Sequence, residues 1–228
     1  MRHIGIGTFQ FTDKMRSNAL EVLESGRISY GPQSQQFETE FAELHGCEYG
    51  ILSNSGTSSL LVALQTLKEV HNWQDGDEII VPAITFVATV NIVLQSGLKP
   101  ILVDVESDYY GINVEKISEV ITDRTRCIIP VHTFGQPANM DKLTDLLVDD
   151  IDRPLGVIED SCESMLVTHH SRPVGSWGDI ACFSTYMAHL LTTGVGGIAI
   201  TDNQLYADTM RSLCNHGLSY NDLSAQKD

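Results

Sequence analysis

The sequence predicts an α/β fold in which a mostly parallel sheet of seven strands lies between two layers of helices, a three-layer sandwich. Three observations support this prediction. Seven short runs of apolar, largely β-branched residues recur along the 228-residue chain. Each run is continuously apolar rather than alternating, as in strands that are covered on both faces. Helical patterns separate the runs, and this alternation favours a doubly wound sheet with helices on both faces.

The expected strands share this continuous apolar character and are residues 50–53, 78–82, 101–105, 127–131, 156–160, 181–184 and 197–201. An apolar stripe within residues 60–67 predicts a helix that follows Thr57, and the same spacing within residues 114–121 predicts another. Ligands of such sheets bind at the carboxyl ends of the strands. The residues directly after each strand are therefore the candidates for a site.

The chain is expected to form one large domain over residues 1–228. Within it we expect an N-terminal arm over about residues 1–35 and a core over about residues 36–217. A polar tail over residues 218–228 is expected to hold no further strand. The length alone does not require a second domain.

The composition excludes several classes of partner. Thirty acidic side chains against 14 basic ones give a formal net charge of −16, which repels a phosphate backbone and an anionic membrane surface. No apolar stretch approaches the roughly 18 residues of a membrane span, and the amino-terminal stretch lacks a signal-peptide core. The five cysteines are odd in number and widely spread, which predicts free thiols in a reducing, cytoplasmic compartment. Neither nucleic acid nor a membrane is expected as a partner.

Polar residues follow three of the expected strands. Residues 54–59, Asn-Ser-Gly-Thr-Ser-Ser, lead into the helix over residues 60–67, and such a helix N-terminus binds anions through its backbone N–H groups. The same residue types are also common as plain helix caps. Asp160 ends the strand over residues 156–160, where it could bond to a pyridinium nitrogen or cap a turn. Phe86 follows the strand over residues 78–82, where it could stack on a planar ligand or pack in the core.

Two histidine positions outside these motifs leave alternatives open. His132 follows the strand over residues 127–131, where it could approach a substrate or simply pack. His169 and His170 suggest a metal ligand pair, but adjacent side chains point apart on most backbones. No Cys-x-x-Cys pair occurs either, so no metal site is expected.

The motifs, taken in order, resemble the sugar aminotransferase family typified by DegT, DnrJ, EryC1 and StrS, which has the pyridoxal-phosphate (PLP) fold type I. The matching motifs are Tyr30-Gly31-Pro32, Phe37-Glu38, Ser55-Gly56-Thr57, Gly76-Asp77-Glu78, Val81-Pro82, Gly135-Gln136-Pro137, Glu159-Asp160, Gly175-Ser176, Gly178-Asp179, Phe183-Ser184, Gly196-Gly197 and Asn215-His216-Gly217. They span nearly the whole chain. The resemblance implies that pyridoxal 5′-phosphate or pyridoxamine 5′-phosphate is the cofactor.

By the same resemblance, specific residues contact the cofactor. Gly56, Thr57 and the Ser184 hydroxyl are expected to bind its phosphate. Phe86 is expected to stack on its ring, and Asp160 to pair with the ring nitrogen.

The chain departs from the aminotransferase pattern at the position that decides the chemistry. The family carries a lysine five residues beyond the serine of Phe183-Ser184, and this lysine holds the cofactor covalently. His189 stands there instead, and an imidazole cannot replace a primary amine in that bond. The chain has six lysines, none near an alternative motif: Lys14, Lys68, Lys99, Lys116, Lys142 and Lys227.

A histidine at this position resembles the family's 3-dehydratase branch. Histidine side chains in general titrate at about pH 6.5, so they can abstract and return protons at neutral pH. Glu163 stands where the family has Gln or His near the ring hydroxyl, and the stretch over residues 159–163 resembles that branch. The resemblance then implies a reaction like that of GDP-4-keto-6-deoxymannose 3-dehydratase. His189 would take a proton from the aminated cofactor and help protonate the departing 3-hydroxyl. The CDP-type counterpart needs an iron–sulfur cluster, and the scattered cysteines offer no ligand set.

The resemblance also implies partners: a nucleotide-linked keto sugar, an amino donor such as glutamate, and a second copy of the chain in a homodimer. Family members continue for over a hundred residues beyond Asn215-His216-Gly217 into a small C-terminal domain, which this chain is expected to lack. Three hypotheses therefore stay open: a sugar 3-dehydratase, a sugar-nucleotide aminotransferase, and a truncated non-catalytic cofactor-binding fragment.

Overall fold

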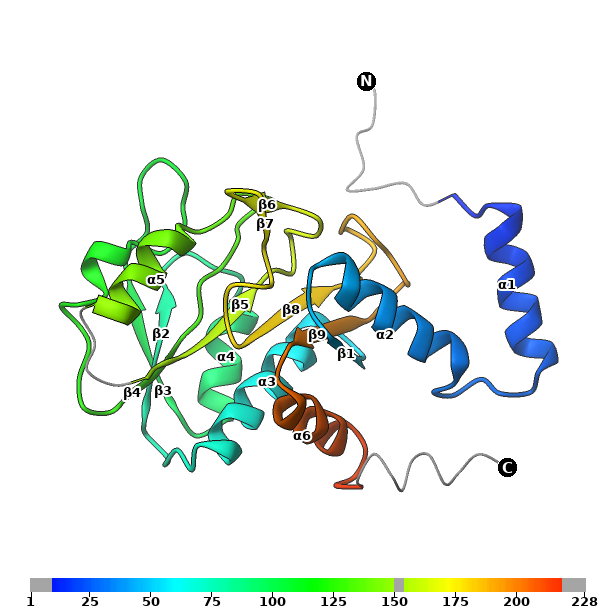
Figure 1. Ribbon diagram of the computed structural model, residues 1–228, viewed down its shortest axis with the longest axis horizontal. Coiled ribbons are helices and arrows are strands. Elements are labelled where there is room, and N and C mark those ends of the chain that lie inside the picture. The colour runs from blue at the N-terminus through cyan, green and yellow to red at the C-terminus, as the bar shows by residue number, and fades with distance from the viewer. Residues whose placement is uncertain (1–9, 150–153, 219–228) are drawn as a thin grey trace.

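The computed structural model describes residues 10–149 and 154–218, and its centre is a seven-stranded sheet in the order β1-β9-β8-β5-β4-β2-β3 (Figure 1). Strands β2, β3, β4, β5 and β8 pair in parallel, and β9 runs antiparallel to both β8 and β1. The prediction of a mostly parallel seven-stranded sheet is confirmed. The strand bounds are β1 Tyr49–Ser53, β2 Glu78–Pro82, β3 Lys99–Val103, β4 Thr125–Ile128, β5 Gly156–Asp160, β8 Ile180–Ser184 and β9 Gly197–Thr201.

The fourth strand ends earlier than the apolar run predicts. The run extends to residue 131, but β4 stops at Ile128 as a regular strand. Pro130 has no N–H to donate to the ladder, so beyond it only an isolated bridge between Val131 and Asp160 continues the pairing. The segment after β4 therefore leaves the regular ladder near the carboxyl end of β5.

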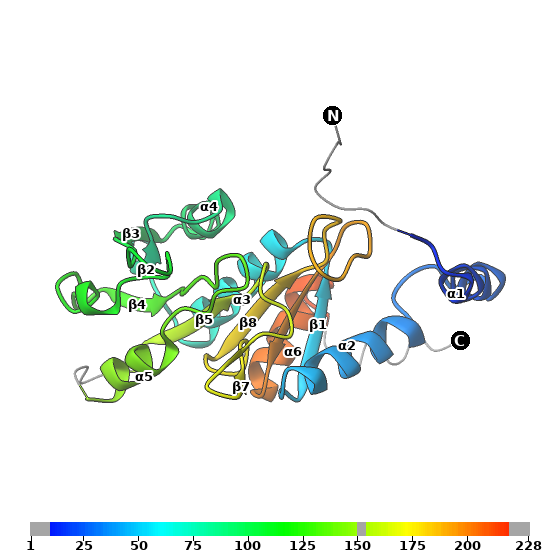
Figure 2. The same cartoon turned by 90° about the horizontal axis from the view of Figure 1, so that it is seen from above.

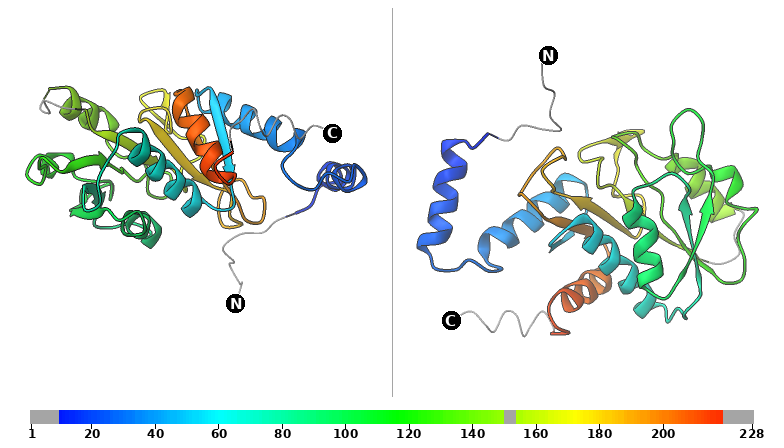
Figure 3. Two further views of the ribbon diagram at one scale, coloured as in Figure 1. Left: turned by 90° about the horizontal axis from the view of Figure 1, so that it is seen from below. Right: turned by 180° about the vertical axis from the view of Figure 1, so that it is seen from behind.

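Helices cover both faces of the sheet. One face packs against α3 Gly56–Val70, α4 Val87–Gln95 and α6 Gln204–Cys214, with α3 and α6 side by side (Figure 3). The opposite face packs against α2 Pro32–Leu44 and α5 Met140–Asp149, and α4 and α5 lie on opposite sides of the strands (Figure 2). Neighbouring strand residues alternate between the two cores, which confirms the three-layer sandwich.

One local prediction is wrong, and one small element was not predicted. The pattern over residues 114–121 forms only the short 3₁₀ helix η1 Val114–Lys116, because its backbone bonds span three residues: Ile117 N–H donates to the Val114 carbonyl, and Val120 N–H to that of Ile117. Apolar side chains three residues apart share a face in either kind of helix, so the pattern did not separate them. A small hairpin, β6 Thr168–His169 and β7 Arg172–Pro173, was not expected at all.

The arm before the core contains α1 Asp13–Glu24, which buries no residue and stands away from the sheet (Figure 1). Its N-terminus is capped by Thr12, whose hydroxyl accepts a hydrogen bond from Met15 N–H at 3.2 Å. Within residues 10–149 and 154–218, no helix is both long and apolar enough to span a bilayer. Most of the expected polar tail, residues 219–228, lies outside the described residues, and the domain boundaries stay predictions.

Candidate active site

A cavity of about 620 Å³ opens at the carboxyl ends of the parallel strands. Its lining comes from the segments that follow β1, β2 and β4, from the end of β5, and from the segment that follows β8. The structure brings all the sequence-predicted site residues to this one cavity: Gly56, Thr57, Phe86, Asp160, Glu163, Ser184 and His189. The sheet therefore gathers residues that lie more than a hundred positions apart.

The N-terminus of α3 forms one wall. The Ser55 hydroxyl caps the helix by accepting from Ser58 N–H at 3.1 Å, whereas the N–H groups of Gly56 and Thr57 have no partner within the helix ladder. A Cβ on Gly56 would lie 2.7 Å from the Cys162 Sγ, so only glycine lets the helix approach this closely. The partial positive charge of the helix end and these N–H groups suit an anion.

The tight packing of this helix start predicts the effect of one substitution. A Cβ added to Gly197 would lie 2.4 Å from the backbone carbon and oxygen of Ser55, which cannot move without displacing the start of α3. Gly197→Ala should lower the free energy of unfolding by about 1–3 kcal/mol in urea denaturation. Gly31→Ala is the control, because its Cβ would first meet the flexible Arg27 side chain at 3.1 Å. Equal stability of the two variants would contradict this account of the packing.

Asp160, at the end of β5, is held in a fixed orientation. It is only 5% exposed, and its Oδ2 accepts a hydrogen bond from the Thr89 hydroxyl at 2.8 Å. Its Oδ1 accepts from the backbone N–H of Cys162 at 3.3 Å. Thr89, which sequence reasoning missed, also contacts the Thr85 hydroxyl at 2.9 Å. No local pattern marks Thr89, because its contact joins residues 71 positions apart.

Glu159, the neighbour of Asp160, is fully buried and points to the other side of β5. Its Oε1 accepts from the backbone N–H groups of Trp177 and Gly178, both at 2.7 Å, and its Oε2 from Gly175 N–H at 2.8 Å. His132 Nε2 completes the set at 3.0 Å. Burial by itself would raise the pKa of Glu159, but these hydrogen bonds outweigh it and hold the pKa below its usual value. Glu159 thus anchors the loop over residues 175–178.

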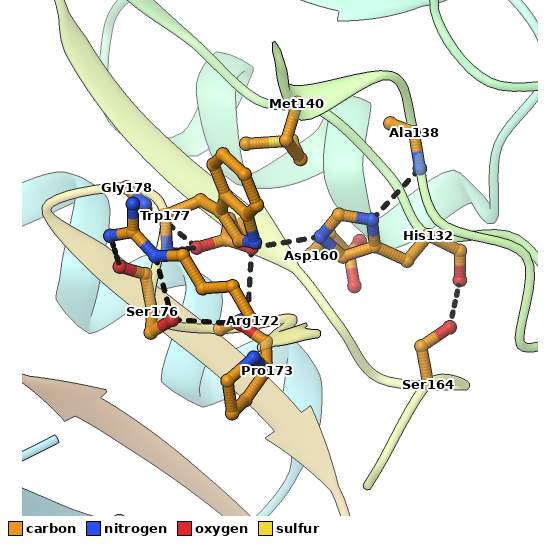
Figure 4. Close-up of polar contacts among 12 residues, drawn as sticks. His132, Ala138, Met140, Asp160, Ser164, Arg172, Pro173, Ser176, Trp177 and Gly178 are labelled. Carbon is orange, nitrogen blue, oxygen red and sulfur yellow. Dashed lines mark hydrogen bonds and ion pairs between the residues drawn. The ribbon is translucent and has the colours of Figure 1, made fainter. Parts of the chain in front are cut away.

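His132 is a packing residue rather than a free side chain. Its Nδ1 accepts from Ala138 N–H at 3.0 Å, so the ring carries its proton on Nε2 and donates it to Glu159 (Figure 4). Its backbone N–H donates to the Asp160 carbonyl at 3.0 Å, and its carbonyl accepts from the Ser164 hydroxyl at 2.6 Å. His132 borders the cavity, but both of its ring nitrogens are hydrogen-bonded within the protein. Of the two roles that the sequence left open, approach to a substrate and packing, the structure favours packing.

His189 lies in the loop after β8 and is half-buried. Its backbone N–H donates to the Tyr186 carbonyl at 2.9 Å, and the two rings lie roughly perpendicular with centroids 6.2 Å apart. Tyr186 is a lining residue that sequence reasoning did not single out. The imidazole thus contacts an aromatic ring, and the side chain borders the cavity.

Phe86 and Glu163 stand at the mouth of the cavity. Phe86 is 73% exposed and precedes α4, so a ring face is free for a ligand rather than packed in the core. Glu163 accepts a hydrogen bond from Phe134 N–H at 3.2 Å and so ties the loop after β4 to the segment after β5.

Taken together, the site presents three fixed features that match a planar pyridine ring bearing a phosphate. The α3 N-terminus suits the phosphate, the buried Asp160 carboxylate suits a protonated ring nitrogen, and exposed Phe86 suits a ring face. A mixed seven-stranded sheet with this site at its strand ends defines the fold type I architecture of PLP-dependent proteins.

Comparison with known proteins agrees with this assignment of the fold. Residues 10–227 match the DegT/DnrJ/EryC1/StrS aminotransferase family, and the chain belongs to that family. The spore coat polysaccharide biosynthesis protein SpsC of Bacillus subtilis is 37% identical over 199 residues, which cover 87% of this chain and 49% of SpsC. The chain spans about half the length of the curated relatives it matches.

Two solved structures show the same fold. The aminotransferase from Psychrobacter cryohalolentis superposes with a TM-score of 0.87 at 35% identity, over 96% of this chain and 54% of that one. The GDP-4-keto-6-deoxy-D-mannose-3-dehydratase of E. coli, with bound hydrated PLP, gives a TM-score of 0.85 at 29% identity, over 93% and 54% of the two chains.

Proposed function

We propose that the chain is a nucleotide-sugar enzyme that depends on pyridoxal 5′-phosphate or pyridoxamine 5′-phosphate and catalyses a 3-dehydratase-like step on a 4-keto-6-deoxy sugar. One observation carries the proposal: His189 borders the same cavity as Asp160 and the N-terminus of α3. Within the described part of the chain, no lysine lines that cavity. PLP in the structurally similar E. coli 3-dehydratase supports the choice of cofactor.

The proposed roles follow from the contacts described above. The N–H groups of Gly56 and Thr57, with the Ser184 hydroxyl, bind the phosphate. Asp160 accepts a hydrogen bond from the ring nitrogen and keeps it protonated, and Thr89 holds the carboxylate in position. When bound, the cofactor would supply an electron sink for breaking bonds at the neighbouring sugar carbons.

His189 supplies the acid and base in this proposal. One imidazole nitrogen takes up a proton from carbon and returns a proton to the oxygen of the departing 3-hydroxyl. Imidazole suits both directions near neutral pH. Phe86 covers a face of the ring and Glu163 lies near the ring hydroxyl, which completes the proposed contacts.

A sugar-nucleotide aminotransferase is the second candidate. The identity of 35% to the Psychrobacter aminotransferase exceeds the 29% to the E. coli dehydratase, which favours it. Against it stands His189, because covalent attachment of the aldehyde needs a primary amine. In both candidates the partners are a nucleotide-linked keto sugar and an amino donor such as glutamate.

A homodimer belongs to the proposal, because large apolar side chains near the cavity are left uncovered. Phe86 is 73% exposed, Phe134 85%, Leu190 76% and Val195 70%. Exposed apolar surface of this kind marks an interaction face.

The test exchanges the histidine for the family's amine. His189→Lys, incubated with pyridoxal 5′-phosphate and then borohydride, should gain one covalently bound cofactor at position 189, because the cavity orients the aldehyde towards that residue. Leu190→Lys is the control, since it places a lysine one residue away on a side chain that does not line the cavity. Intact-protein and peptide mass spectrometry give the readout. Stoichiometric labelling of a native lysine in the unsubstituted chain, or none in His189→Lys, would overturn the proposal.

A further inference from the structure

A second cluster of ligand-type side chains lies outside the cavity and plays no part in the proposed chemistry. It consists of Asp141 in the first turn of α5, His169 at the end of β6, and His170 in the hairpin turn. The Asp141 Oδ2 lies 2.6 Å from His169 Nε2 and 2.8 Å from His170 Nδ1. Segments 28 positions apart thus bring three donor atoms within 4.8 Å of one another.

The backbone explains why two adjacent histidines reach one point, contrary to the sequence expectation. His170 and Ser171 form a two-residue turn between β6 and β7, with φ angles of +47° and +66°. Positive φ at both central positions is the signature of a type I′ hairpin turn. At this turn the chain leaves the alternating pleat, so His170 turns back onto the side of His169. The two rings stack with centroids 4.4 Å apart.

We propose that Asp141, His169 and His170 form a binding site for a divalent transition metal ion, with Zn²⁺ as the best match. Two imidazoles and one carboxylate are a common zinc donor set that leaves a fourth position to water or another ligand. Tetrahedral zinc with bonds of about 2.0–2.1 Å separates its ligand atoms by about 3.3 Å. The two contacts to Asp141, at 2.6 and 2.8 Å, would need to lengthen by about 0.7 and about 0.5 Å to reach this separation. His170, with 75% of its side chain exposed, leaves the ion an entry path.

The surroundings hold the ligands in place. The ring of His169 packs edge-on against Trp177 with ring centroids 5.6 Å apart, and the guanidinium of Arg172 lies over the Trp177 ring, 4.5 Å from its centroid. The backbone N–H of Trp177 in turn donates a hydrogen bond to the buried Glu159. This support fixes one imidazole before any ion binds, which raises metal affinity.

The electrostatic setting also favours a cation. The lysine next to Asp141 in sequence, Lys142, pairs with Glu115 at 3.1 Å rather than with Asp141. The chain as a whole carries a formal net charge of −16. An arriving cation is therefore attracted, and the carboxylate is shared with no lysine or arginine in the ion pairs of the described residues.

The experiment titrates the tag-free, reduced chain with ZnCl₂ by calorimetry and with CoCl₂ by visible absorbance. We expect one ion per chain and a cobalt spectrum of nitrogen and oxygen ligation. His170→Asn should weaken Zn²⁺ binding by about 100-fold or more, since even outer contacts of metal ligands are worth about 10- to 100-fold. Asparagine tolerates positive φ, so the turn is kept. Asp141→Asn is the second variant, should the first fold poorly.

His216→Asn is the matched control, because His216 is another exposed histidine, at φ +59°, outside the cluster. It should bind Zn²⁺ like the unsubstituted chain. The proposal is overturned by absence of saturable binding, by equal affinity in His170→Asn and the unsubstituted chain, or by an equal loss of affinity in His170→Asn and the control His216→Asn. A sulfur-to-cobalt charge-transfer band would also overturn it, by placing the ion on a cysteine. None of these readouts depends on the proposed sugar chemistry.

Discussion

Asp160→Ala should weaken the binding of pyridoxal 5′-phosphate by about 10- to 100-fold, because a hydrogen bond to a charged group contributes about 1.5–3 kcal/mol. The Asp160 side chain is only 5% exposed and is oriented by two hydrogen-bond donors. Water therefore does not fully replace the hydrogen bond that the carboxylate makes to the cofactor. Titration of the purified chain, followed by cofactor absorbance or protein fluorescence, measures the dissociation constant.

Thr89→Val should weaken cofactor binding less than Asp160→Ala does. It removes the 2.8 Å hydrogen bond to Asp160 but keeps the carboxylate and the shape of the side chain. An intermediate weakening of about 2- to 10-fold is expected for the loss of one positioning hydrogen bond. If Asp160→Ala bound the cofactor as tightly as the unsubstituted chain, the carboxylate would not face the ring nitrogen and the proposed orientation would be wrong.

Glu159→Ala should lower the free energy of unfolding by about 3–5 kcal/mol, the largest stability effect expected in this chain. The substitution leaves three backbone N–H groups and the His132 Nε2–H without the acceptor they share in the core. Glu163→Ala is the matched control. It makes the same change at an exposed side chain four positions further on and removes one hydrogen bond, that from Phe134 N–H. It should cost about 0.5–1 kcal/mol in the same urea denaturation.

The pH dependence gives this second prediction a sign. The pKa of Glu159 is lower in the folded chain than the ordinary glutamate value of about 4.5, so its ionised form stabilises the fold. That contribution is present above the unfolded pKa and is lost as pH falls through the folded pKa. The stability difference between the unsubstituted chain and Glu159→Ala should therefore shrink below about pH 4.5. A difference that grows on acidification would contradict the assignment.

The strands were predictable because each is covered on both faces, and burial leaves a continuous apolar run that composition reveals directly. The start of α3 was also predictable, since Ser55 and the apolar stripe after it mark a helix N-terminus. The pattern over residues 114–121 failed because side chains three apart suit a 3₁₀ turn as well. The β6–β7 hairpin has two residues per strand, too few for any periodicity.

The cavity residues were identified by motif order, and the structure places them together, while their roles rest on the proposal. What the sequence could not show were contacts set by tertiary packing. Thr89 reaches Asp160 across 71 positions, and Glu159 bonds to a loop 16 to 19 positions away. The pairing of His169 with His170 depends on a positive φ that no apolar pattern encodes.

A crystal structure of the chain with pyridoxamine 5′-phosphate tests the central claim most directly. The account predicts the phosphate against the N–H groups of Gly56 and Thr57, the ring nitrogen within hydrogen-bonding distance of Asp160, and His189 beside the ring with no covalent link to the protein. Cofactor bound elsewhere, turned with its ring nitrogen away from Asp160, or absent at saturating concentration would contradict it.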